Sequence, residues 1–129
     1  MATAQKNHLE LTRGEFEVMQ HLWRLGHAFL GEVVESFGQP RPAYTTISTV
    51  IRTLETKGFV RHRRYGNSHR YTPTLSRKEY AEQQVLRLLE QFFHGSAGEL
   101  VRFMASEEVL SEEQRAALLE AARELIRTE

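Results

Sequence analysis

Helix-start signals precede several stretches of the chain in which apolar residues recur at helical spacing. Four segments place Ser or Thr three residues before Glu or Gln, the spacing of a capping box, in which each side chain bonds to the other residue's backbone N–H. These segments are Thr12–Glu15, Ser76–Glu79, Ser96–Glu99 and Ser111–Gln114. Since helical apolar spacing follows each of them, we expect a helix to begin at each.

Three helices are predicted in the first half of the chain, over about residues 13–25, 30–37 and 44–57. Their core-facing residues are Phe16, Met19, Leu22 and Trp23 in the first, Leu30, Val33, Val34 and Phe37 in the second, and Ile47, Val50, Ile51 and Leu54 in the third. Gly26 and Gly58 are expected to end the first and third helices, because glycine commonly follows a helix C-terminus.

Two β-capable runs follow the third helix, Phe59–Arg63 and His69–Pro73. The Gly66-Asn67 pair between them predicts a turn, so we expect a two-stranded hairpin. Three helices followed by a hairpin is the order of a winged helix-turn-helix domain, which we place at residues 8–74.

Residues 75–129 show helical patterns only, and helices are predicted over about 77–94, 97–105 and 112–128. The expected fold class is therefore mainly α with a small β-hairpin. It consists of a winged helix-turn-helix N-terminal domain and a helical C-terminal dimerisation domain.

Composition excludes several kinds of site. The chain has no Cys, which excludes a disulfide framework, a thiolate metal site and a cysteine nucleophile. All 17 acidic residues are Glu, which excludes a catalytic aspartate or an EF-hand loop. No apolar run approaches the roughly 18 residues of a membrane helix, and the first ten residues are too polar for a signal peptide, so we expect a cytoplasmic protein without membrane insertion.

The net charge of zero conceals an uneven distribution. Residues 1–40 carry three Lys or Arg and five Glu, residues 41–80 carry nine and two, and residues 81–129 carry five and ten. A basic middle between acidic flanks favours binding to a polyanion, although a solvated charged surface would give the same pattern.

The outward face of the helix predicted at 44–57 carries mainly hydroxyl side chains, whereas an exposed helix face more usually carries Glu and Lys. Short hydroxyls let a helix sit deep in the major groove of DNA, and Arg52 is the one residue on this face able to bond to two guanine atoms. The candidate DNA-binding residues of this helix are Tyr44, Thr45, Thr46, Ser48, Thr49, Arg52 and Thr53. The alternative is a solvent-exposed face without a partner.

The hairpin is a candidate wing because Arg61, Arg63, Arg64 and Arg70 cluster on ten residues. Its candidate DNA contacts are Arg63, Arg64, Tyr65 and Asn67, which would meet the DNA backbone or the minor groove. An edge strand protected from aggregation by its charges is the alternative.

Sites for catalysis or metal binding are not indicated. Among the six histidines only His62 and His69 are expected to come close, across the hairpin, and two ligands without Cys or Asp make a poor metal site. No Ser/His/acid order, phosphate loop or Gly-rich cradle is present, so we expect no cofactor and no catalytic residue.

The C-terminal segment carries more apolar surface than its own short helices can bury. Its first helix carries an apolar stripe that begins at Tyr80 and ends at Phe93. The stripe either packs back on the N-terminal domain or forms a shared core in a homodimer, which a reader of inverted repeats requires. The candidate dimerisation residues are Leu88, Leu89, Phe92, Phe93, Leu100, Val101, Phe103, Met104, Leu118, Ala122, Leu125 and Ile126.

Three motifs carry a family resemblance. They are Leu11-Thr12-x-x-Glu15-x-x-Val18-Met19-x-x-Leu22-Trp23, Tyr44-Thr45-Thr46-Ile47-x-Thr49-Val50-x-x-x-Leu54-x-x-Lys57-Gly58 and His69-Arg70-Tyr71-x-Pro73. Together with Leu100-Val101-Arg102-Phe103, they make residues 9–126 similar to the BlaI/MecI penicillinase-repressor family.

The resemblance implies a winged-helix homodimer that binds an inverted-repeat operator in double-stranded DNA and represses transcription. It also implies a partner pathway, a membrane-bound sensor metalloprotease whose signal leads to cleavage of the repressor in its dimerisation region. The best-known members are cut at an Asn-Phe pair, with which Arg102-Phe103 aligns here. A winged-helix module that binds proteins instead of DNA is the main alternative, and a hydrolase is a more distant one.

Overall fold

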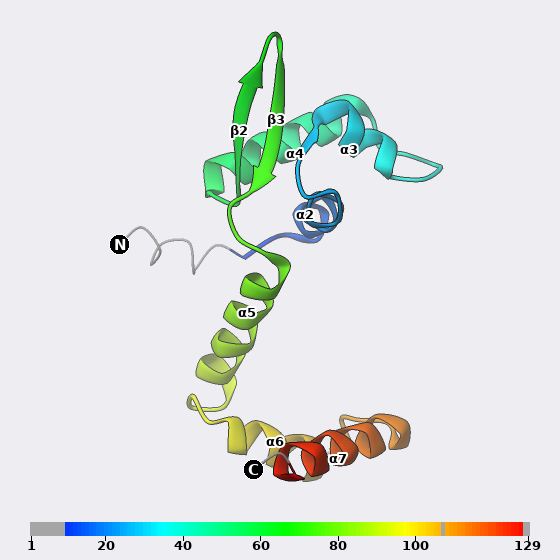
Figure 1. Ribbon diagram of the computed structural model, residues 1–129. Helices are drawn as coiled ribbons and strands as arrows, with labels where there is room; N and C mark the ends of the chain where they lie inside the picture. The colour runs from blue at the N-terminus through cyan, green and yellow to red at the C-terminus, as the bar shows by residue number, and fades with distance from the viewer. Residues whose placement is uncertain (1–9, 107, 128–129) are drawn as a thin grey trace. The chain divides into compact units, whose positions relative to one another are not determined.

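The computed structural model describes residues 10–106 and 108–127, which form six helices and three strands (Figure 1). In chain order the elements are α2 (Arg13–Leu25), β1 (Ala28–Phe29), α3 (Leu30–Ser36), α4 (Tyr44–Lys57), β2 (Val60–Tyr65), β3 (Ser68–Pro73), α5 (Arg77–Phe92), α6 (Ala97–Ser106) and α7 (Glu112–Arg127). The chain divides into two compact units, one up to Gln83 and one from Gln84 onward.

The helix ends match the expected ones within two residues, and capping explains two of the starts in full. At α2 the Glu15 backbone N–H donates to the Thr12 hydroxyl at 3.2 Å, and the Thr12 N–H donates to the Glu15 carboxylate at 2.9 Å. Ser76 and Glu79 form the same reciprocal pair at α5, with distances of 3.0 and 2.8 Å. These boxes confirm two of the four predicted capping boxes in full.

The first unit packs α2, α3, α4 and a small sheet around one core. Its most deeply buried side chains are Met19, Leu22, Val33, Ile47, Ile51, Leu54 and Phe59. Gly58 joins α4 to β2 at φ 92°, a left-handed conformation that costs glycine nothing and most other residues about 1–2 kcal/mol. The predicted winged helix-turn-helix arrangement is confirmed.

The predicted hairpin of β2 and β3 is confirmed, and a third strand that was not predicted joins it to give a sheet in the order β1-β3-β2. β1 pairs antiparallel with β3, bringing Ala28 opposite Tyr71 and Phe29 opposite Arg70. A strand of two residues is too short to show an alternating pattern, and it exists only because β3 lies beside it. β2 and β3 pair from Val60–Pro73 to Tyr65–Ser68, and Gly66, at φ 62°, lies in the turn.

Tyr80 belongs to the core of the first unit, so for this first residue of the apolar stripe the alternative of packing back on the N-terminal domain is confirmed. The side chain is only 8% exposed and packs against the rings of Phe16, Trp23 and Phe59. Its hydroxyl accepts a hydrogen bond from the backbone N–H of Leu11 at 3.2 Å. The first unit therefore includes the start of α5 and extends past residue 74.

The second unit contains the rest of α5 with α6 and α7. The rings of Phe93 and Phe103 lie 5.4 Å apart, and Arg115 donates to the Ala105 carbonyl at 3.3 Å.

Within the described residues, no helix combines the length and the apolarity needed to cross a membrane.

Candidate nucleic-acid interface

α4 presents the predicted hydroxyl-rich face outward because its opposite face is anchored in the core. Ile47, Ile51 and Leu54 are buried, whereas Tyr44 is 55% exposed. The other exposed candidates are Thr45, Thr46, Thr49, Arg52 and Thr53, and Ser48 is half-buried. The structure therefore brings all seven candidate residues of this helix onto one continuous surface.

Arg52 lies along this surface and is held by its own helix. Its Nη2 donates to the Ser48 hydroxyl at 3.2 Å, one turn earlier. The Thr56 hydroxyl in turn donates to the Arg52 carbonyl at 3.1 Å. A guanidinium has five N–H donors, so the hydrogen bond to Ser48 leaves Arg52 able to donate to a base edge or a phosphate as well.

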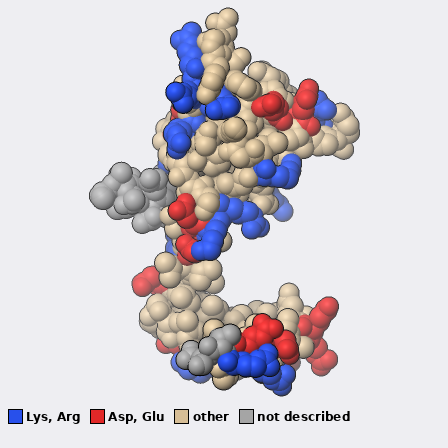
Figure 2. All heavy atoms as spheres, in the orientation of Figure 1, with Lys and Arg blue, Asp and Glu red and all other residues tan. Residues whose placement is uncertain are grey.

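The hairpin distributes its arginines over two faces. Arg63 lies opposite Arg70 and Arg64 lies opposite His69. Because side chains alternate along a strand, Arg61, Arg63 and Arg70 share one face, and Arg64 shares the other with His69. Figure 2 shows Lys and Arg atoms gathered along the hairpin. The predicted basic wing is thus a two-sided basic element.

Tyr65 and Arg70 stiffen the wing near its tip. The Tyr65 ring meets the Phe29 ring edge-on at 5.9 Å, and the Arg70 guanidinium lies 4.8 Å from the centre of the Tyr65 ring. Arg70 also donates to the Tyr65 hydroxyl at 2.9 Å. Tyr65 therefore has a packing role that the sequence did not reveal, since Phe29 reaches it only through β1.

Arg64 folds back on the turn, where its Nε donates to the Gly66 carbonyl at 3.0 Å. This contact occupies one donor and leaves the two Nη groups of the guanidinium for a phosphate. Asn67, the last wing candidate, is exposed in the turn between β2 and β3.

A cluster that sequence reasoning missed joins α4 to the wing. His62 Nδ1 and the Glu55 carboxylate lie 2.6 Å apart, and the ring of His62 stacks on that of His69 at 4.2 Å. The expected approach of the two histidines is confirmed. Burial and the nearby Glu55 carboxylate raise the pKa of the Tyr71 phenol above its ordinary value. The described residues contain no group of three His, Cys, Asp or Glu able to hold a metal ion.

The candidate dimerisation residues differ widely in exposure. Leu89 is buried, and Phe93, Leu100, Met104 and Leu118 are half-buried. The exposed ones are Leu88, Phe92, Val101, Phe103, Ala122, Leu125 and Ile126. A groove of about 560 Å³ between α6 and α7 is lined mainly by apolar residues, including Val101, Leu118 and Leu125.

The pair Arg102-Phe103 lies within α6. Phe103 packs on Phe93, and the Arg102 carbonyl accepts a hydrogen bond from the Ser106 hydroxyl at 2.7 Å. The bond between the two residues is therefore part of a regular helix, and a protease that needs an extended substrate reaches it only after α6 unwinds.

The family model of the penicillinase repressors matches residues 11–124. The chain belongs to the penicillinase repressor family. This confirms the resemblance carried by the three motifs.

Two curated proteins are similar in sequence to this penicillinase repressor family member. The chain is 26% identical over 106 residues to the penicillinase repressor of Bacillus licheniformis, covering 81% of this chain and 83% of that protein. It is 28% identical over 109 residues to a 16.5 kDa protein encoded in the ptsI 3′ region of Latilactobacillus sakei, covering 83% and 74%.

Two solved structures are also similar. One is the solution structure of the DNA-binding domain of the repressor BlaI, with a TM-score of 0.49 and 26% identity, covering 55% of this chain and 88% of that one. The other is the ligand-free organohalide-sensing regulator RdhR-CbdbA1625, with a TM-score of 0.47 and 15% identity, covering 98% and 68%.

Proposed function

We propose that this penicillinase repressor family member is a transcriptional repressor that binds an inverted-repeat operator in double-stranded DNA as a homodimer. The observation that carries the proposal is the outward face of α4, where hydroxyl side chains surround Arg52 and the arginines of the hairpin lie nearby in sequence. On a solvent-exposed helix without a partner, Glu and Lys would be expected in these positions, because they favour helix formation more than Thr does.

In this proposal α4 enters the major groove. The threonine hydroxyls bond to phosphates or base edges, their methyl groups touch thymine, and Arg52 reads a guanine. The first-turn N–H groups of α4 add phosphate donors, because the residue before the helix, Ala43, has no side-chain oxygen to cap them.

The wing neutralises phosphates beside the groove. Arg63 and Arg64 extend from opposite faces of the hairpin, which suits an element that lies between two strands of a DNA backbone. Their contribution to affinity is then largely independent of sequence, whereas that of Arg52 depends on the base pair.

The second unit supplies the homodimer contact. Phe92, Leu125 and Ile126 are 67%, 70% and 71% exposed, and the apolar groove between α6 and α7 lies in the same unit. Exposed apolar surface that extends over a patch commonly marks a protein interface. A second copy that covers these residues would also set the spacing of the two α4 helices for a symmetric operator.

Relief of repression by proteolysis at Arg102-Phe103, through a membrane-bound sensor metalloprotease, is carried over from the family and stays a prediction. A protein-interaction module without DNA is the competing function.

Sequencing of genomic fragments retained by the purified full chain tests the proposal. We expect a short inverted repeat to be enriched and its affinity to fall steeply with added salt. Retention of unrelated fragments with no shared site would contradict a repressor, and no retention at all at low salt would favour the protein-interaction module.

A further inference from the structure

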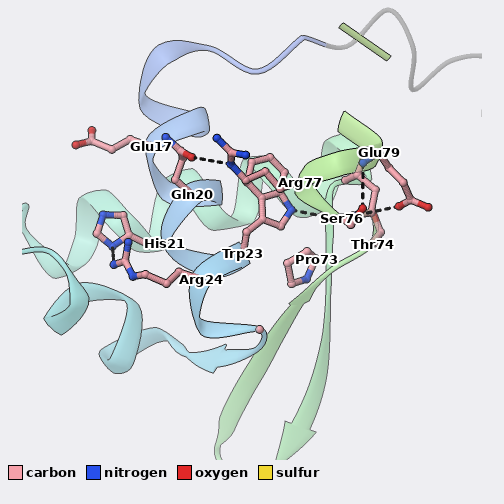
Figure 3. Close-up of a pocket in the computed structure, with 12 residues that line it drawn as sticks. Glu17, Gln20, His21, Trp23, Arg24, Pro73, Thr74, Ser76, Arg77 and Glu79 are labelled. Carbon is pink, nitrogen blue, oxygen red and sulfur yellow. Dashed lines mark hydrogen bonds between the residues drawn. The ribbon is translucent and has the colours of Figure 1, made fainter. Parts of the chain in front are cut away.

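A cleft of about 770 Å³ lies in the first unit, away from the outward face of α4 and from the wing tip. Figure 3 shows it between the last turns of α2 and the segment that joins β3 to α5. Its lining includes Gln20, Trp23, Arg24, Pro73 and Arg77. The volume falls in the range of about 300–1,000 Å³ that is typical of small-molecule sites.

The walls of the cleft are held in place before any ligand arrives. Trp23 Nε1 donates to the Leu75 carbonyl at 3.0 Å, which fixes the indole against the connecting segment. Arg77 Nε reaches the Gln20 side-chain oxygen at 3.4 Å, as the dashed line in Figure 3 shows. Such preorganisation lowers the entropic cost of binding.

Arg24 lies on the other side of the cleft. Its Nη2 donates to His21 Nδ1 at 2.9 Å, and the His21 ring stacks on Phe37 at 3.8 Å. The Ser36 hydroxyl lies 2.8 Å from the same ring nitrogen, so His21 is held from two sides. A guanidinium has five N–H donors, and Arg24 keeps the others for a ligand. Burial, reinforced by the Arg24 charge, lowers the pKa of His21, which favours the neutral imidazole.

The charged side chains that line the cleft are not all free to bind a ligand. Glu79 accepts from the Ser76 N–H in its capping box, and Figure 3 shows the carboxylates of Glu17 and Glu79 extending outward at opposite ends of the cleft. Arg77 and Arg24 therefore offer donors on two sides of a cleft that Trp23 and Pro73 also line, and Figure 3 shows the Arg24 side chain directed toward His21, away from Trp23. A guanidinium matches a carboxylate with two parallel hydrogen bonds, and an indole favours a flat partner.

We propose that this cleft binds a small, flat organic acid, with its carboxylate at Arg77 or Arg24 and its apolar body against Trp23 and Pro73. The proposal goes beyond DNA binding, and its test needs no DNA, so its failure leaves the proposed repressor function untouched.

Trp23 is the only tryptophan, so its indole N–H gives one unambiguous NMR signal in the full chain. We expect titration with cinnamate to move this signal to saturation with a dissociation constant of roughly 0.1–1 mM, as for small fragments. The neutral isostere cinnamamide should bind at least about tenfold more weakly, because it cannot form charge-assisted bonds.

Arg24→Gln and Arg77→Gln are the test variants, and Arg13→Gln, an exposed arginine of α2 outside the lining, is the matched control. At least one of the first two should weaken cinnamate binding about tenfold, and the control should bind as the wild type does. An unchanged thermal unfolding midpoint shows that a variant is folded. A shift that never saturates, equal binding of cinnamamide, or unchanged binding in both test variants would overturn the proposal.

Discussion

The Glu15 carboxylate accepts a hydrogen bond from Lys57 Nζ at 2.8 Å, which ties the first turn of α2 to the last residue of α4. Glu15 is only 7% exposed, and the same carboxylate oxygen also accepts from the Thr12 N–H. One side chain therefore caps one helix and positions the end of another.

Lys57→Met is expected to lower the free energy of unfolding by about 1–3 kcal/mol, because it leaves the Glu15 carboxylate largely buried without its cationic partner. Urea unfolding at neutral pH measures the change. Lys78→Met is the matched control, since Lys78 forms an exposed pair with Glu82 at 2.6 Å and its loss should leave the unfolding midpoint unchanged. Equal effects of the two substitutions would contradict the role of Lys57.

The same pair predicts a pH dependence of stability. Burial alone would raise the pKa of Glu15, but the hydrogen bonds from Lys57 and Thr12 and the charge of Lys57 outweigh it, so the pKa is lowered. The unfolded chain then takes up the proton at higher pH than the folded one. The stabilisation is thus complete above the ordinary carboxylate pKa of about 4.3 and is lost as the pH falls through the folded value.

Glu15→Gln tests this pH dependence. The difference in unfolding free energy between wild type and variant should be largest near neutral pH and should shrink at about pH 3. A difference that stays constant over this range would show that the charge of Glu15 contributes nothing.

Arg52→Ala should cost about 1–3 kcal/mol of binding free energy on the preferred site if Arg52 reads a guanine edge. It should also relax the preference at one base pair in each half-site. Gel shifts with the enriched site and a scrambled site measure both effects. Arg13→Ala serves as the control, because Arg13 is an exposed arginine of α2 and not of α4. Equal weakening on the two sites would make Arg52 a phosphate contact instead.

Arg63→Ala and Arg64→Ala should weaken binding similarly on any duplex and reduce the salt slope by roughly one each. The two residues lie on opposite faces of the hairpin, so their losses should add in the double variant. Binding is measured at several salt concentrations. Unchanged affinity of the double variant would mean that the arginines protect an edge strand and do not contact DNA.

A chain ending at Gln83 is expected to be a folded monomer, because it keeps Tyr80 and the rest of the first core. It should bind a half-site far more weakly than the full chain binds its operator, since the second contact is no longer linked to the first. A chain ending at Leu75 should unfold at a lower temperature, because it lacks Tyr80. Sedimentation and thermal unfolding measure these properties.

The full chain with Leu125→Glu is the matching test of the dimer. Leu125 is exposed in α7, so the substitution should leave the fold intact and place a charge in the proposed contact between copies. We expect this variant to be monomeric at concentrations where the wild type dimerises. A truncated chain that still dimerises, or a full chain that stays monomeric at tens of micromolar, would remove the dimer assignment.

Local signals in the sequence predicted the helices and the main hairpin because each depends on neighbouring residues. The capping pairs Thr12–Glu15 and Ser76–Glu79 lie within one helical turn, and the periodicity of Ile47, Ile51 and Leu54 depends only on helical geometry. The outward face of α4 followed directly, since residues opposite a buried stripe must point out.

Contacts between residues distant in sequence were decided by the tertiary structure alone. β1 forms because β3 supplies its hydrogen bonds, and Tyr80 is buried because Phe16, Trp23 and Phe59 surround it. The same holds for the Glu15–Lys57 pair and for the cleft beside Trp23. The spacing of apolar residues in the sequence predicts which side chains are buried. The residues that contact or bond to them are determined only when the helices and strands pack together.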